Sequence, residues 1–352
     1  PGDTPHDNVQ FLVFCAAVLR AVDRFQGLLR ASVASAGNDH RLGANEAPPA
    51  IISIFLGDQL TEIFEQIEAG SATSTRRGGV LDTGAGVLPK LSRDAGDRNR
   101  TSPFAFTGNK FEFRAVSSSQ NVALPAICLN VAVTEALDHV ATALETAVAA
   151  GRPLEEAVRT LLVDTVKAHK RIIFNGNGYS DEWREEAQRR GLLNLRDTVD
   201  ALPQMVTPEV LAAFEKYRVM NAREVRARYD VAVEAYNKTI NVEAQLMVLM
   251  ANRYILPASL AYQTEVAANV NTVKAAGGTT AAGERTLRTL CELNDAFQAA
   301  TADLAHALEH TNGSPESHAR YFRDEVIPRM ARLRELGDRI ECVVPSESWP
   351  LP

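Results

Sequence analysis

Helical periodicity over more than half of the sequence constrains the fold of this chain most. Residues 122–150 form a strongly apolar helical pattern that Gly151 ends, and residues 207–276 and 284–336 carry further long helical patterns. Strand signals are almost absent from these segments. Because long amphipathic helices bury their apolar faces only against one another, the sequence predicts a helical bundle from about residue 151 onward. Pro257 is expected to kink or end one of these helices.

The first third of the chain mixes helical patterns with short extended ones. Residues 7–36 predict one helix ended by Gly37, and Ile51–Leu56 is interpreted as either a strand or the approach to a short helix over residues 60–67. Residues 70–96 are rich in Gly, Ser, Thr and Arg and predict a long flexible loop. The expected fold class is therefore α+β, mostly α, in two parts: residues 1–150 and residues 151–352.

A β-hairpin is predicted directly after that loop. Phe104–Phe106 forms the first strand, Thr107-Gly108-Asn109 the turn, and Lys110–Arg114 the second strand. In the second strand charged and aromatic residues alternate, so Phe111 and Phe113 face one side while three charged residues face the other. The charged face consists of Lys110, Glu112 and Arg114.

This charged face is the first candidate site. A carboxylate between two cations can hold a divalent metal on Glu112 while Lys110 and Arg114 bind phosphate or carboxylate groups. Arg98 and Arg100, just upstream, add two guanidinium groups suited to the same anions. The alternative is a solvated strand whose ions merely pair with one another.

The loop Asn38–Pro49 is the second candidate. Its functional interpretation is a mobile lid that carries Arg41 and Glu46 to a site, and the alternative is a plain surface connection, because Gly, Asn and Pro are common in turns. The segment Asn175–Trp183 predicts a turn followed by a helix that Ser180 caps.

Several other classes of site are not supported by the sequence. His306 and His310 have metal-ligand spacing but lack the H-E-x-x-H pattern and are interpreted as surface histidines, and Gly78–Gly86 lacks the Lys-Ser/Thr of a phosphate-binding P-loop. The four cysteines form no C-x-x-C pair, which predicts neither a zinc site nor disulfides and favours a reducing, cytoplasmic setting. A formal net charge of −7 argues against a nucleic-acid binder, and the absence of a run of about 18 apolar residues predicts no membrane span.

Taken together, these motifs resemble those of glutamine synthetase, and their residue sequences are similar to those of the large type III branch. The resemblance is carried by Asn38–Pro49, Arg98-Asn-Arg-Thr101 and Lys110-Phe-Glu-Phe-Arg114, in the order and spacing of that family. Three further segments resemble type III as well: Pro1–His6, Asn175–Trp183 and Val344–Pro352. The resemblance implies that residues 1–150 are the C-terminal part of a catalytic domain, with an antiparallel sheet and helices, and that residues 151–352 are the helical C-terminal region.

The resemblance also implies the chemistry. In that family ATP phosphorylates the side-chain carboxylate of glutamate, and ammonia then displaces the phosphate from γ-glutamyl phosphate. Positioning and charge neutralisation dominate phosphoryl transfer, so cations and divalent metals are the expected tools. By resemblance Glu112 is a ligand of the Mg²⁺ or Mn²⁺ ion that bridges the ATP phosphates, and Arg100, Lys110 and, less directly, Arg98 bind ATP and its phosphates.

Three residues are implied at the substrate end of the site. Arg114 and Arg41 hold glutamate or the acyl phosphate, and Glu46 on the lid takes a proton from ammonium and shuts out water. Arg41 and Glu46 are thus the implied catalytic residues.

Family members carry most of their metal ligands upstream of the point where this chain begins, and the chain opens without an initiator Met. We therefore expect a piece of a longer protein with no ligase activity by itself. The resemblance implies a homo-oligomeric ring, a dodecamer, with glutamate, ammonia and ATP as partners. Two alternatives stay open: a related glutamate–amine ligase, and a non-catalytic helical assembly module, for which residues 151–352 alone suffice.

Overall fold

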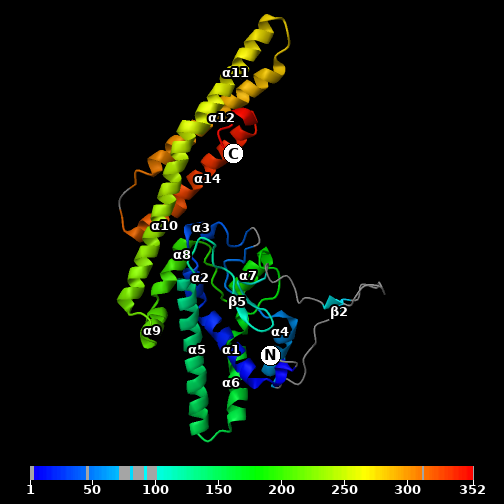
Figure 1. The fold of residues 1–352 in the computed structure, drawn as a ribbon, viewed down its shortest axis with the longest axis vertical. Helices are drawn as coiled ribbons and strands as arrows, with labels where there is room; N and C mark the ends of the chain where they lie inside the picture. The colour runs from blue at the N-terminus through cyan, green and yellow to red at the C-terminus, as the bar shows by residue number, and fades with distance from the viewer. Residues whose placement is uncertain are drawn as a thin grey trace. The chain divides into compact units, whose positions relative to one another are not determined.

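The chain divides into two compact units in the computed structural model (Figure 1). Unit 1 is Pro1–Tyr229 and unit 2 is Asp230–Pro352. The domain boundary expected at residue 150 stays a prediction; that position lies inside unit 1, between two packed helices. The residues that the structure describes are 4–44, 47–70, 80–81, 91–92, 101–310 and 313–351.

The N-terminal helix is broken rather than continuous. Asn8 starts it by accepting a hydrogen bond from the backbone N–H of Phe11 at 3.0 Å, and Phe25 interrupts it with a ψ of 24°. The prediction of one helix over residues 7–36 is therefore wrong. The second segment packs closely against Gln204, because a Cβ at Gly27 would lie 2.6 Å from its Oε1. The segments are η1 (Pro5–Asp7), α1 (Val9–Arg24), α2 (Gln26–Ser32) and α3 (Ala36–Asp39).

The sheet of unit 1 combines the predicted hairpin with one parallel strand. β4 (Phe104–Phe106) and β5 (Phe111–Phe113) are antiparallel, with Ala105 opposite Glu112, which confirms the hairpin. β1 (Ile54–Phe55) pairs in parallel with β4, so the strand order is β1-β4-β5 and the sheet is mixed. The run Ile51–Leu56 thus provides both a strand and the approach to the helix α4 (Gly57–Glu68). Within residues 70–96, which the sequence predicts as a loop, Val80–Leu81 (β2) and Leu91–Ser92 (β3) pair antiparallel.

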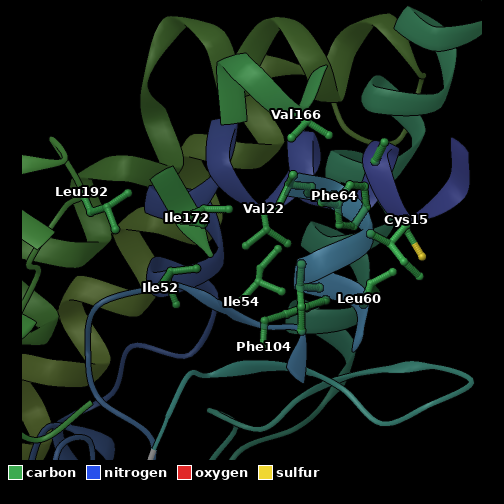
Figure 2. Close-up of a cluster of buried hydrophobic side chains, with 14 of the residues drawn as sticks. Cys15, Val22, Ile52, Ile54, Leu60, Phe64, Phe104, Val166, Ile172 and Leu192 are labelled. Carbon is green, nitrogen blue, oxygen red and sulfur yellow. The ribbon is translucent and has the colours of Figure 1, made fainter. Parts of the chain in front are cut away.

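The core of unit 1 lies where this sheet meets α1, α4 and α6. Ile54 and Phe104 on adjacent strands point into it together with Val22 of α1 and Phe64 of α4 (Figure 2). Phe104 also contacts both aromatic residues of β5, with ring centroids 5.7 Å from Phe111 and 5.7 Å from Phe113. The aromatic face of the hairpin is therefore anchored in the core, and its charged face is directed away from it.

Helices complete unit 1. The predicted helix over residues 122–150 is confirmed as α5, and Gly151 follows it with a φ of +85°, a backbone conformation that favours glycine. Among the described residues α5 is the one helix long and apolar enough to cross a membrane, by length and composition only, and it packs against α1 and α6. The remaining elements are α5 (Ala123–Ala149), α6 (Leu154–His169), η2 (Lys170–Ile172), α7 (Asp181–Arg189), α8 (Thr198–Ala201), η3 (Leu202–Val206) and α9 (Pro208–Lys216).

All regular elements among the described residues of unit 2 are helical, as the sequence predicts. α11 packs on α12 and α12 packs on α14. Pro257 does not stop its helix: a π-helical turn, η4, precedes it and joins α10 to α11, because the wider turn accommodates the missing proline N–H. The elements are α10 (Ala222–Met250), which spans the boundary with unit 1, η4 (Ala251–Ile255), α11 (Leu256–Ala275), α12 (Ala281–Ala307), α13 (Pro315–Tyr321), η5 (Phe322–Val326), α14 (Ile327–Glu341) and η6 (Ser346–Ser348).

Candidate active site

The charged face of β5 is present as the alternation predicts. Nζ of Lys110 lies 3.2 Å from Oε1 of Glu112, so the two side chains share a face of the strand. The Lys110 side chain is 64% exposed and that of Glu112 is 30% exposed. An ion pair this exposed contributes little to stability. Each of the two groups can therefore give up this ion pair and bind a ligand instead.

Arg114 continues the hairpin ladder at the end of β5. Its backbone N–H donates to the carbonyl of Pro103 at 2.9 Å, and its Nη2 donates to the carbonyl of Ser102 at 3.2 Å. The guanidinium is thereby held against the strand that precedes the hairpin turn, and the side chain is only partly exposed. This fixes one cation at a defined position beside the charged face.

Arg41 reaches the same strand end from the loop after α3. Its Nη1 donates to the carbonyl of Ala115 at 3.2 Å, and its Nη2 donates to the carbonyl of Arg114 at 3.4 Å. Nη1 also donates to Oδ1 of Asn38 at 3.2 Å. These bonds use three of the five N–H donors of the guanidinium and leave two for a ligand within the described part of the chain. The structure thus brings together Arg41 and Arg114, which are more than seventy residues apart in sequence.

Asn38 is a residue of this site that sequence reasoning missed. Its side chain is fully buried, and Nδ2 donates to the carbonyl of Val33 at 2.7 Å and to the carbonyl of Ala115 at 2.9 Å. It therefore ties the start of the loop to the end of β5 and orients Arg41 at the same time. The available signal in the sequence was its position as the first residue of the loop motif. A buried amide there needs several hydrogen-bond partners at once.

Two backbone hydrogen bonds join the described residues of the loop after Arg41. Gly43 has a φ of +79°, and its N–H donates to the carbonyl of Pro48 at 2.9 Å. Ala47 donates to the carbonyl of Ala44 at 3.0 Å. Glu46 itself lies outside the described residues, as do Arg98 and Arg100, so their assigned roles stay predictions.

The segment Asn175–Trp183 contacts both β1 and the loop that carries Arg41. The N–H of Phe174 donates to the carbonyl of Ile54 at 2.8 Å, which places this segment beside β1. Asn175 then caps α4, since its Oδ1 accepts from the backbone N–H groups of Leu56 at 3.0 Å and Gly57 at 3.2 Å. The hydroxyl of Tyr179 donates to the carbonyl of Ala47 in the loop.

The helix that follows begins as predicted. The Oγ of Ser180 accepts from the N–H of Trp183 at 3.2 Å, which confirms Ser180 as the cap of α7. Trp183 is buried and stacks on Phe174 with centroids 3.6 Å apart. The segment is therefore well packed, and it fixes the positions of both β1 and the loop.

One buried ion pair stabilises the start of the loop. Nη2 of Arg30 lies 3.4 Å from Oδ1 of Asp39, and the Nε of Arg30 donates to the carbonyl of Leu195 at 2.8 Å. Burial raises the pKa of Asp39. The N–H and hydroxyl of Thr198 donate to this carboxylate and act in the opposite direction on its pKa. Burial also lowers the pKa of Arg30. Desolvation thus acts against both charges, and their mutual attraction opposes it.

Among the described residues no group of three or more His, Cys, Asp or Glu side chains could hold a metal ion. Glu112 offers a single, partly exposed carboxylate. Mg²⁺ is commonly bound by one or two carboxylates together with waters and substrate phosphates. Glu112 therefore fits the role of one ligand, and the remaining ligands would have to come from elsewhere.

Part of this chain matches a family model of known proteins. Residues 157–274 match the family model described as the glutamine synthetase C-terminal domain. The family model thus confirms the resemblance to glutamine synthetase over residues 157–274, about a third of the chain.

Three curated relatives align with the whole chain, and one of them is named as a type-3 enzyme. The type-3 glutamine synthetase of Dictyostelium discoideum is 38% identical over 360 residues, which cover 100% of this chain and 49% of the relative. The glutamine synthetases of Butyrivibrio fibrisolvens and Bacteroides fragilis are 36% and 35% identical over 364 residues, again 100% of this chain and 50% of each relative. The chain thus spans about half the length of the curated relatives that it matches.

Proposed function

We propose that this chain is the C-terminal half of a glutamate–ammonia ligase. The reaction is the ATP-dependent joining of ammonia to the side-chain carboxylate of glutamate through γ-glutamyl phosphate. The observation that carries the proposal is the convergence of Arg41 and Arg114 at the end of the strand that bears Lys110 and Glu112. The similarity to glutamine synthetases over the whole chain supports it.

Lys110 and Glu112 form the phosphate end of the proposed site. When ATP binds, its phosphate oxygens replace Glu112 as the partner of the Lys110 ammonium, and Glu112 becomes available as a metal ligand. Mg²⁺ or Mn²⁺ bound there would neutralise phosphate charge. Arg98 and Arg100 are proposed to add further positive charge at this end.

Arg41 and Arg114 form the substrate end. The two guanidinium N–H groups that Arg41 retains can donate to the oxygens of a carboxylate or an acyl phosphate next to the strand end. Glu46, in the loop that Gly43 and Pro48 close, is proposed to take the proton from ammonium and to keep water from the acyl phosphate.

The proposal extends to the protein as a whole. The described residues supply one wall of a site, so we propose that this chain alone is inactive and that the upstream half brings further metal ligands. A homo-oligomeric ring of twelve subunits and a cytoplasmic location are proposed on the same similarity.

The first test assays the 352-residue chain alone with ATP, Mg²⁺, glutamate and ammonia. No glutamine is expected from it, and glutamine formation would contradict the proposed division of the site. The second test uses the longer protein, in which we expect Glu112→Gln to lower kcat roughly a hundredfold while the oligomer stays intact. Glu186→Gln is the matched control, because Glu186 on α7 pairs with Arg189 and Arg190 rather than with a residue assigned to the site.

The second candidate, an assembly module, is favoured by one observation. α10 exposes large apolar side chains in unit 2, with Val242 61% and Leu246 51% exposed. If Glu112→Gln left activity unchanged while Leu246→Glu dissociated the oligomer, the results would support a structural role over a catalytic one. A panel of larger amines in the same assay separates an ammonia ligase from a related glutamate–amine ligase.

A further inference from the structure

A small cavity lies behind the loop that carries Arg41, entirely within unit 1. Its volume is about 240 Å³. At about 30 Å³ for each water molecule, this is room for about eight non-hydrogen atoms. Residues of the loop and its flanks form one side, the segment Asn175–Trp183 and α7 form another, and the stretch before α8 forms the third. The lining residues used below are Asp39, Leu42, Ala50, Tyr179, Arg184 and Arg196.

Two guanidinium groups on this lining are available to a ligand. The backbone of Arg196 is fixed, because its carbonyl accepts from Nη2 of Arg30 at 3.3 Å. Its side chain is exposed and has no ion pair or hydrogen bond within the described residues. Within the described part of the chain, Arg184 pairs with Asp181 alone, one turn earlier on α7 and at 2.6 Å. An exposed pair of this kind is worth so little that a better anion can displace it.

The carboxylate on the lining does not cancel this charge. Asp39 is already engaged by Arg30 and by both the N–H and the hydroxyl of Thr198. The positive charge of Arg184 and Arg196 therefore remains effective inside the cavity. A small anion with two or more oxygens matches two fork-shaped donors better than a neutral molecule does.

We propose that this cavity binds a small phosphate or carboxylate anion, held by Arg184 and Arg196, and that the bound anion braces the loop. The anion would contact Leu42 on one side and the segment of Tyr179 on the other. Tyr179 already holds the loop through the carbonyl of Ala47. Occupancy therefore links the loop at two points to the segment of Tyr179. Anion binding in this cavity does not depend on the proposed ligase reaction.

Binding is tested by isothermal titration calorimetry on the 352-residue chain. The probes are inorganic phosphate and succinate, which has eight non-hydrogen atoms, each titrated at constant ionic strength maintained with sodium chloride. One saturable site per chain is expected for at least one probe, and the probe that binds identifies the anion class. Arg196→Gln is expected to weaken binding at least tenfold. Ala50→Leu, which fills the cavity without altering its charges, is expected to abolish binding.

Arg189→Gln is the matched control, because Arg189 lies on α7 and pairs with Glu186 but does not line the cavity. Its affinity should equal that of the unaltered chain. Absence of saturable binding of both probes would overturn the proposal, as would equal weakening by Arg189→Gln and Arg196→Gln.

Loop bracing has its own measurement. Trypsin cleaves after Arg41, and a saturating anion is expected to slow this cleavage several-fold while cleavage after Lys274 in unit 2 stays unchanged. Equal rates after Arg41 with and without the anion would overturn the bracing.

Discussion

The side-chain amide of Asn38 donates a hydrogen bond of 2.9 Å to the carbonyl of Ala115, joining the loop of Arg41 to the end of the strand of Glu112. The same side chain accepts from Arg41. One buried residue therefore sets the relative position of the two sequence motifs from which the site is built.

Asn38→Ala is expected to destabilise unit 1 by about 1–3 kcal/mol, because it leaves the carbonyl of Val33 buried without its donor. Urea unfolding followed by circular dichroism measures the change. Asn130→Ala, at an exposed position of α5, is the control and should stay within about 0.5 kcal/mol of the unaltered chain. A loss at Asn38 no larger than that at Asn130 would show that the amide does not hold the loop.

The buried pair of Arg30 and Asp39 should behave as a unit. Arg30→Met is expected to cost about 3–5 kcal/mol, since it leaves a desolvated carboxylate without its cation. The double variant Arg30→Met with Asp39→Asn should recover part of that loss, and a double-mutant cycle in urea gives the coupling free energy. Simple additivity of the two losses would contradict the pairing.

Asn175→Ala is expected to cost about 0.5–2 kcal/mol, because Asn175 satisfies two N–H groups at the start of α4. Thermal unfolding measures it. Asn177→Ala in the same segment is the comparison, since the exposed side chain of Asn177 accepts one hydrogen bond within the described residues, from the N–H of Tyr179. Equal shifts of the melting temperature would mean that capping of α4 is not the role of Asn175.

The cysteines should differ sharply in reactivity. Burial raises the pKa of Cys15 to about 12 and that of Cys128 to about 12, so at pH 8 only about 1 in 10⁴ of these thiols is ionised. Since folding raises these pKa values, each thiol contributes stability that is fully present below about pH 9 and is lost as the pH rises toward 12.

Labelling with a thiol-specific disulfide reagent at pH 8 and peptide mass spectrometry test this difference. The exposed Cys342 should react within minutes, while Cys15 and Cys128 should react only after unfolding. Cys342→Ser should remove the fast phase. Fast native labelling of Cys15 would contradict its burial.

Local signals made part of this fold predictable. The hairpin of β4 and β5 follows from five alternating residues and a Gly-containing turn, and the cap at Ser180 follows from its own neighbours. The parallel pairing of β1 with β4 does not follow, because some fifty residues separate the strands and neither is longer than three residues. The break of the N-terminal helix at Phe25 does not follow either, because the apolar periodicity that predicts one helix includes Phe25 itself.

The site shows the same division. Alternation alone placed Lys110 and Glu112 on one face, where their side chains meet. The convergence of Arg41 with Arg114 followed only from the family resemblance, since no local pattern connects the two. Asn38 and Asn175 were missed because the partners of a buried amide are fixed by tertiary contacts far along the chain.

The two π-helical turns of unit 2 share a spacing. η4 and η5 each end two residues before a proline, Pro257 and Pro328 respectively. A π turn holds about one residue more than an α turn, which rotates everything after it by roughly 100° about the helix axis. The apolar faces of α11 and α14 are therefore out of phase with the helices that precede them. Deleting a single residue within either turn would swing the following helix away from α12, so the length of each turn sets which side chains can meet.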